Sequence, residues 1–154
     1  GKSECALELI VKGHRLIADD AVRLHQRRNS IYASSLELTK HHMEIRGLGV
    51  INVLDLYGAA SVRERKRVEL VVEMLDGSES APVDRLGLDE YTTRLLGAEV
   101  AKVTIPVRPG RNVSSIVEVA ARNHLLKLQG HHAAQSLSER VNAQLLANIK
   151  EEAT

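Results

Sequence analysis

The chain has 154 residues, 44% of them hydrophobic and 27% charged, which excludes a disordered protein and favours one domain with a sizeable core. Its net charge of +1 gives no overall attraction to nucleic acid or to a membrane, and its 2% aromatic content argues against base stacking. The single cysteine, Cys5, excludes an internal disulfide and fits a reducing cytoplasm, and no apolar run is long enough to span a bilayer.

The first three residues, Gly1-Lys2-Ser3, match the end of a phosphate-binding loop. In such a loop the backbone N–H groups cradle phosphates, the lysine reaches the β- and γ-phosphates, and the hydroxyl holds Mg²⁺. The tripeptide alone is equally compatible with chance, because the glycine-rich first half of the loop does not precede it. The run Ser3–Lys12 is predicted to be a helix that stops at Gly13. A helix directly after Gly-Lys-Ser favours the phosphate-loop interpretation, since helix N-termini attract anions.

Two adjacent carboxylates, Asp19 and Asp20, follow a short apolar segment, His14–Ala18, that is predicted to be a buried strand. Carboxylates at the C-terminal end of a strand lie where open α/β sheets bind ligands. The alternative is a solvated turn, because Asp is common in turns. The phosphate loop just upstream favours a metal or general-base role.

Further apolar and β-branched runs predict strands, which are expected at Val22–His25, Ser30–Ser35, Val68–Leu75, Thr92–Val100 and Ala101–Val107. The first two are joined by a basic turn at residues 27–29. The segment 76–82 is rich in Gly, Ser and Pro and is predicted to be a loop.

Two further segments combine charge with special backbone residues. In the stretch from residue 43 to residue 52, Gly47 and Gly49 permit positive φ angles, and a carboxylate, a guanidinium and a β-branched run flank them. This pattern predicts a bulged turn entering a core element. The charged run Arg63–Arg67 is interpreted as a solvated strand entry and not as a nucleic-acid patch, because no aromatic residue is interleaved.

The C-terminal third begins with a loop rich in proline and arginine, followed by Asn112 as a helix N-cap. Arginines beside a helix N-terminus form an anion site, although an ordinary capped loop with exposed arginines is a serious alternative. Two amphipathic helices are predicted, one from Val113 that ends at Gly130 and one from Ala134 to the end of the sequence, and these would pack on the sheet, on each other or on another subunit. The pairs His41-His42 and His131-His132 are interpreted as surface residues, since neighbouring side chains face different ways.

These motifs, in this order, resemble the C-terminal catalytic domain of HPr kinase/phosphorylase, chiefly through the strings EIRGLGVINV and IPVRPGRN. The resemblance covers essentially the whole chain. It implies an α/β fold, a P-loop kinase core resembling phosphoenolpyruvate carboxykinase, with a mixed β-sheet, flanking helices and two C-terminal amphipathic helices. It also implies that residues 1–154 form a single catalytic domain, and that an N-terminal domain, a catalytic histidine and the front half of the phosphate loop are absent from this chain.

The activity implied is bifunctional: a cytoplasmic, hexameric bacterial enzyme phosphorylates a regulatory serine of the phosphocarrier HPr with ATP or pyrophosphate and removes that phosphate by phosphorolysis. By the same resemblance, Gly1, Lys2 and Ser3 bind the nucleotide. Ser3 and Glu44 hold Mg²⁺ (or Mn²⁺). Asp19 is the general base for the target serine, and Asp20 supports it or the metal. Arg85 stabilises charge on the transferring phosphoryl group.

Two longer segments complete the implied site. A signature serving both directions comprises Met43, Glu44, Ile45, Arg46, Gly47, Leu48, Gly49, Val50, Ile51 and Asn52. A loop serving mainly phosphorolysis, by placing inorganic phosphate, comprises Pro106, Val107, Arg108, Pro109, Gly110 and Arg111.

Two other functions remain open from the sequence: a non-catalytic nucleotide- or phosphate-sensing assembly module, and a related P-loop kinase for a small molecule. A sensor needs no general base and no cation for the transition state. The joint presence of Asp19, Glu44 and Arg85 therefore favours the enzyme.

Overall fold

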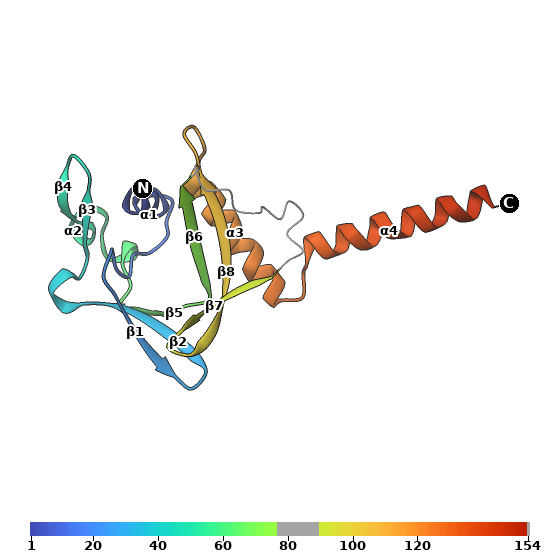
Figure 1. Cartoon of the computed structure of the whole chain (residues 1–154). Helices are drawn as coiled ribbons and strands as arrows, with labels where there is room; N and C mark the ends of the chain where they lie inside the picture. Colours follow the sequence, from blue (N-terminus) through green and yellow to red (C-terminus); the bar gives the residue numbers. More distant parts are fainter. Residues whose placement is uncertain (77–89, 154) are drawn as a thin grey trace.

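Figure 1 shows the computed structural model of the chain, which describes residues 1–76 and 90–153. Its elements are, in chain order, α1 (Lys2–Val11), β1 (Val22–Arg27), β2 (Ser30–Ser35), η1 (Glu37–Thr39), β3 (His42–Ile45), β4 (Gly49–Asn52), α2 (Val53–Tyr57), η2 (Ala59–Ser61), β5 (Arg65–Arg67), β6 (Leu70–Asp76), β7 (Tyr91–Leu95), β8 (Ala98–Val107), α3 (Val113–Leu128) and α4 (Ala133–Glu152). The α/β fold and the two C-terminal helices are as predicted, whereas the predicted loop at 76–82 lies almost entirely outside the described residues.

The strands of the described chain form three small sheets. The order β6-β8-β7 is mixed, because β8 pairs parallel with β6 and antiparallel with β7. Asp76 and Val107 are register partners at the carboxyl ends of β6 and β8. The two strand ends therefore lie side by side, at the kind of sheet edge where α/β proteins bind ligands.

The predicted hairpin β1–β2 is confirmed, with its antiparallel register running from Val22 opposite Ser35 to Arg27 opposite Ser30. The tight turn contains Arg28, whose φ of 57° is left-handed. Short strand β5 joins the far side of β2, which makes a three-stranded antiparallel sheet. Ile31 and Ala33 of β2 are buried, so one face of this sheet covers the interior.

The predicted strand at His14–Ala18 is wrong. Only Leu16 forms a bridge, parallel to Val62, through its N–H to the carbonyl of Ser61 and its carbonyl to the N–H of Arg63. Leu16 is buried in the cluster of Ile10, Met43 and Val53. The segment is apolar because it crosses the core, and a single bridge satisfies its backbone there.

The boundary between the last two strands also differs from the prediction. The sequence placed it after Val100, but β7 and β8 meet at a two-residue turn, Leu96-Gly97, with φ of 49° and 80°. Positive φ at both central positions is typical of the type I′ turns that join antiparallel strands. Val100 is buried inside β8 and not at a chain reversal.

The last two helices differ in position, as Figure 1 shows: α3 lies along the β6-β8-β7 sheet, whereas α4 extends away from the rest of the molecule. Helix α3 begins as predicted at an N-cap, since Asn112 Oδ1 accepts from the N–H of Ser115. Among the described residues, no helix has the length and apolar character needed to cross a membrane.

Candidate functional site

The front of α1 brings together three residues that the sequence singled out. Ser3 Oγ donates to Asp19 Oδ1 at 2.9 Å, and Asp19 Oδ2 accepts from the backbone N–H of Glu44 at 3.1 Å. Asp19 is half-buried between them. Residues from α1, from the loop before β1 and from β3 therefore converge on one carboxylate at the N-terminus of a helix, where the helix dipole favours anionic ligands.

The hairpin formed by β3 and β4 divides the signature residues 43–52 into structural and exposed members. Met43 is 1% exposed and anchors the hairpin in the core, and Asn52 caps α2 by accepting from the N–H of Asp55. Gly47 and Gly49 have φ of 86° and 96°, a conformation that other residues rarely adopt. The turn, predicted to be bulged, is thus the end of a tight hairpin. Glu44, whose N–H donates to Asp19, is exposed on this hairpin.

A cavity of about 550 Å³ opens between α1, α3 and the carboxyl ends of β6 and β8. Its lining includes Gly1 and Lys2 from the front of α1, Asp76 from the end of β6, Arg111 from the loop after β8 and Ser114 from α3. The volume falls within the range of about 300–1,000 Å³ usual for small-molecule sites. Two cationic side chains that the sequence assigned to phosphate, those of Lys2 and Arg111, thus share one cavity.

The loop that carries Arg111 is held by its own backbone. The N–H of Arg111 donates to the carbonyl of Arg108 at 3.1 Å, and its Nη1 donates to the carbonyl of Pro106 at 3.3 Å. Gly110 adopts the positive φ of 80° that the turn requires. Arg108 is exposed and does not line the cavity, so the two arginines of the loop are placed differently.

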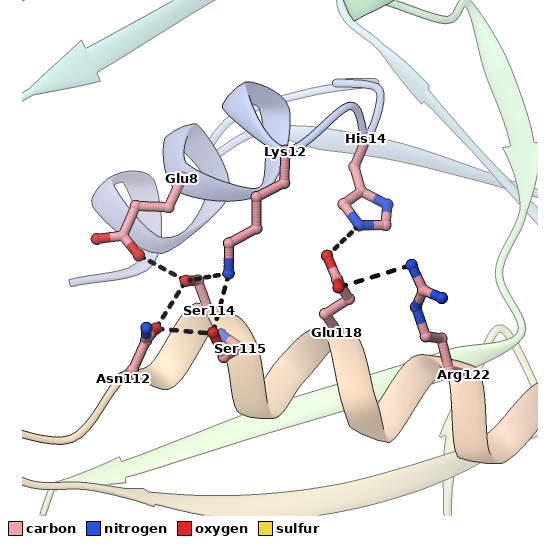
Figure 2. Close-up of polar contacts among 8 residues, drawn as sticks. All are labelled: Glu8, Lys12, His14, Asn112, Ser114, Ser115, Glu118 and Arg122. Atoms are coloured by element: carbon pink, nitrogen blue, oxygen red, sulfur yellow. Dashed lines mark hydrogen bonds and ion pairs between the residues drawn. The ribbon is translucent and has the colours of Figure 1, made fainter.

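A polar junction between α1 and α3, drawn in Figure 2, was not predicted from the sequence. Ser114, 1% exposed, donates to Glu8 Oε2 at 2.5 Å, and Lys12 Nζ donates to Ser114 Oγ at 3.3 Å and to Ser115 Oγ at 3.0 Å. Asn112 Oδ1 lies 2.9 Å from the same buried hydroxyl. These contacts join the helix that follows the phosphate loop to the helix that follows Arg111.

The segment that follows α1 makes a second contact with α3. His14 Nε2 donates to Glu118 Oε2 at 2.7 Å, and Arg122 lies 3.7 Å from the other oxygen of that carboxylate (Figure 2). The hydrogen bond from His14, more than the charge of Arg122, holds the pKa of Glu118 below its ordinary value. The contact between His14 and α3 therefore stabilises the ionised form of the Glu118 carboxyl.

Other side chains are placed in ways that limit their chemistry. Burial raises the pKa of the Cys5 thiol, which makes it a poor nucleophile at neutral pH and fits a structural position on α1. Asp20 is exposed and makes no hydrogen bond within the described residues. Arg85 lies outside the residues that the structure describes.

The histidine pairs bear on the question of metal binding. His42 and His131 are exposed, whereas His41 and His132 are half-buried, so the predicted surface position holds for one member of each pair. In the parts of the chain described, residues 1–76 and 90–153, no three acidic, histidine or cysteine side chains gather as metal ligands.

The fold and this geometry define a class, an α/β domain with a carboxylate held against the serine at the front of its first helix. Within that class, the chain belongs to the HPr Serine kinase C-terminal domain family, whose profile matches residues 1–141.

Individual relatives agree with this assignment. The HPr kinase/phosphorylase of Geobacter sulfurreducens is 49% identical over 146 residues, which cover 94% of this chain and 46% of that protein. The HPr kinase/phosphorylase of Bacillus cytotoxicus is 50% identical over 142 residues, 92% of this chain and 46% of the relative. The solved structure of the Hpr(Ser) kinase/phosphatase from Coxiella burnetii matches with a TM-score of 0.79 and 34% identity, over 89% of this chain and 84% of that chain. The chain therefore has the fold of that enzyme and spans about half the length of the two relatives.

Proposed function

We propose that residues 1–154 are the catalytic domain of a bifunctional enzyme that phosphorylates a serine of HPr and removes the phosphate by phosphorolysis. The observation that carries this proposal is the convergence of Ser3, Asp19 and the backbone of Glu44 at the front of α1. The relatives, whose names state HPr kinase and phosphorylase activities, supply the substrate class.

In the kinase direction, the general base is Asp19. It takes the proton from the serine hydroxyl while the serine oxygen forms a bond to the γ-phosphorus of ATP and the bond to the β-phosphate oxygen breaks. Serine needs such a base because its hydroxyl is a weak nucleophile near neutral pH. Half-burial between the Ser3 hydroxyl and the Glu44 N–H fixes the carboxylate in place, and this preorganisation lowers the cost of reaching the reactive geometry.

In the phosphorolysis direction, an oxygen of inorganic phosphate attacks the phosphorus of phosphoserine. The bond to the serine oxygen breaks, Asp19 returns the proton to that oxygen, and pyrophosphate leaves. We assign placement of the attacking phosphate to Arg111, because Arg111 lines the same cavity as Lys2. Guanidinium groups bind phosphate oxygens in pairs, which orients the anion as well as attracting it.

The phosphoryl donor is ATP or pyrophosphate together with Mg²⁺ or Mn²⁺, and the available donor set fits such an ion. Mg²⁺ is ordinarily held by one or two carboxylates plus substrate phosphates and water, and not by an all-protein cage. The Ser3 hydroxyl and the exposed Glu44 carboxylate would provide oxygen ligands of that kind, beside the Asp19 base. The ion would neutralise phosphate charge, while Lys2 at the cavity wall contacts the β- and γ-phosphates.

The remaining assignments depend on the family. Arg85 stabilises the transferring phosphoryl group, and Asp20 supports Asp19 or the metal. The enzyme works in the cytoplasm as a hexamer of identical chains. An exposed apolar stripe on α4, formed by Leu137, Val141, Leu145 and Ile149, supports assembly.

The experiment that tests this proposal compares acceptors, using the full-length protein that carries this chain, ATP and Mg²⁺. We expect phosphate on HPr and none on HPr whose target serine is replaced by alanine. Transfer to small alcohols at a comparable rate would instead identify a small-molecule kinase. ATP binding without transfer to any acceptor would identify a sensing module.

A further inference from the structure

The polar junction between α1 and α3 forms part of the wall of the cavity that Lys2 and Arg111 share. Glu8, Asn112 and Ser114 belong both to this junction and to the cavity lining. The contacts further along the two elements, which Figure 2 also shows, are made by residues that do not line the cavity. One end of the junction therefore lies at the proposed phosphate site, and the other end lies away from it.

Ser114 is the residue at which α1, α3 and the loop before α3 meet. Ser114 is 1% exposed, and its Oγ lies 2.5 Å from Glu8 Oε2 and 2.9 Å from Asn112 Oδ1. The same oxygen accepts from Lys12 Nζ at 3.3 Å. A buried hydroxyl needs hydrogen-bond partners, and these partners come from both sides of the junction. Ser114 thus connects a carboxylate of α1 with the N-cap residue of α3.

This connection reaches the arginine that is assigned to the attacking phosphate. Asn112, whose Oδ1 caps α3, directly follows Arg111 in the chain. The hydrogen bonds of Arg111 itself, to the carbonyls of Arg108 and Pro106, stay within its own loop. A link from this loop to α1 runs through Asn112 and Ser114.

The front of α1 is anchored independently of this link. Ser3 donates to Asp19, and Ile10 of the same helix is buried in the core cluster. Loss of the link should therefore leave Lys2 in place and displace the loop that carries Arg111. Such a displacement matters because a shift of about 1 Å in a positioning group can cost about 10²-fold in rate.

We propose that Ser114 is a positioning residue, which holds the Arg111 loop against α1 and thereby sets the affinity of the cavity for inorganic phosphate. It acts through Glu8 on one side and Asn112 on the other. The inference rests on the proposed function, which makes this phosphate the attacking group in phosphorolysis. The kinase direction needs no inorganic phosphate and should depend less on Ser114.

The test uses the full-length protein that carries this chain and compares two serine variants. Titration calorimetry measures the Kd of inorganic phosphate, and pyrophosphate release from phosphorylated HPr gives the KM for phosphate. We expect Ser114→Ala to raise both values about five-fold, which corresponds to the loss of about one hydrogen bond. The KM for ATP in the kinase direction should change by less than about two-fold.

Ser115→Ala is the matched control, because it makes the same chemical change one position further along α3. Ser115 Oγ also accepts from Lys12, at 3.0 Å, but Ser115 does not line the cavity. The backbone N–H that Ser115 donates to the N-cap is kept in this variant. Ser115→Ala should therefore change the Kd of phosphate by less than about two-fold.

A double-mutant cycle tests whether Ser114 acts through Glu8. Glu8→Ala alters the charge of the cavity wall, but this alteration is the same in both arms of the cycle and cancels. Because the link to α1 is already broken in Glu8→Ala, adding Ser114→Ala should raise the Kd of phosphate by less than about two-fold. Thermal melts establish that each variant is folded at the temperature of the titration.

Three results would overturn the inference. The first is an equal Kd of phosphate in Ser114→Ala and Ser115→Ala. The second is the full loss of affinity on adding Ser114→Ala to Glu8→Ala. The third is an equal rise in the KM values for phosphate and ATP, since Ser114 would then serve the fold in general. Failure of the proposed function gives a different result, in which the unaltered protein binds phosphate but releases no pyrophosphate from phosphorylated HPr, and the Kd values still decide the role of Ser114.

Discussion

The junction of α1 with α3 and the surface of α4 differ in whether their side chains find partners within the described chain. At the junction, a buried hydroxyl, that of Ser114, is satisfied by Glu8 and Lys12 from the other helix. On α4, Leu137, Val141, Leu145 and Ile149 recur every four residues and are each at least half exposed, and its hydrogen bonds Gln135–Glu139 and Gln144–Asn148 run along the helix itself. The first region is completed by contacts within the chain, whereas the second presents an apolar stripe that the described residues, 1–76 and 90–153, leave exposed.

This difference separates two kinds of experiment. Changes at the α1 side of the molecule should alter chemistry in a chain that stays assembled. Changes on α4 should alter assembly in a chain that stays folded. The predictions below test that separation in order of decreasing expected effect.

The largest effect is expected from Asp19→Asn, which keeps the hydrogen bond from Ser3 within reach but removes the base. Phosphate transfer to HPr should fall between about 10²-fold and 10⁴-fold, while ATP affinity is retained. Asp20→Asn is the paired variant, and because Asp20 is exposed it should cost less. Single-turnover transfer rates and a separate ATP titration measure the two quantities. Transfer by Asp19→Asn at the unaltered rate would disprove the base assignment.

The α4 stripe gives the next effect. The double variant Leu145→Glu/Ile149→Glu should turn an oligomer into a monomer, because each apolar side chain contributes about 1.5–3 kcal/mol when buried. Gln144→Glu/Asn148→Glu adds the same charge on a neighbouring row and should leave assembly intact. Sedimentation velocity measures the oligomeric state. An oligomer that survives the stripe variant would place the subunit interface elsewhere.

Arg111→Ala should slow phosphorolysis by about ten-fold or more and affect the kinase direction less, because Arg111 is assigned to the attacking phosphate. Arg108→Ala, in the same loop but outside the cavity, should have the smaller effect. The rates of pyrophosphate release and of HPr phosphorylation are compared for both variants. Equal losses in the two directions would remove the special role of Arg111.

The smallest expected effect is on the pH dependence of stability, through the contact between His14 and Glu118 of α3. The pKa of Glu118 is lower in the folded chain than its ordinary value of 4.5, chiefly through the hydrogen bond with His14. The contribution to stability is therefore present above pH 4.5 and is lost as the pH falls through the lower, folded value. Glu118→Gln should flatten the acid side of the melting-temperature profile slightly. A steeper acid side in the variant would contradict the assignment.

Features of the fold and site that depend on residues close together in the sequence could be predicted, whereas contacts between distant residues could not. Ser3, Asp19 and Glu44 were identified because each belongs to a short motif with its own signal. The backbone freedom of Gly47 and Gly49 indicated a turn, but the pairing of β3 with β4 into a hairpin was not predicted. The strand predicted at His14–Ala18 was wrong, because a buried loop segment and a buried strand show the same run of apolar residues over five positions.

Contacts between segments far apart in the sequence could not be predicted. Ser114 meets Glu8 across 106 positions of sequence, and nothing local distinguishes Ser114 from an ordinary residue in the first turn of a helix. A cavity lined by basic residues on the sheet β1-β2-β5 likewise depends on the register of β2 with β5, which brings Arg67 beside Tyr32. The sequence showed the charged run 63–67 but not the rings of His25 and Tyr32 and the arginine of β1 that complete the cavity.

The central claim, that the chain transfers phosphate to HPr in both directions through Asp19, is tested most directly in one tube. The full-length protein is mixed with HPr, Mg²⁺ and γ-labelled ATP, and excess inorganic phosphate is added after labelling. The account predicts label on a serine of HPr that then returns as pyrophosphate, with both steps lost in Asp19→Asn. Bound ATP without any label on HPr, or label that phosphate does not release, would contradict it.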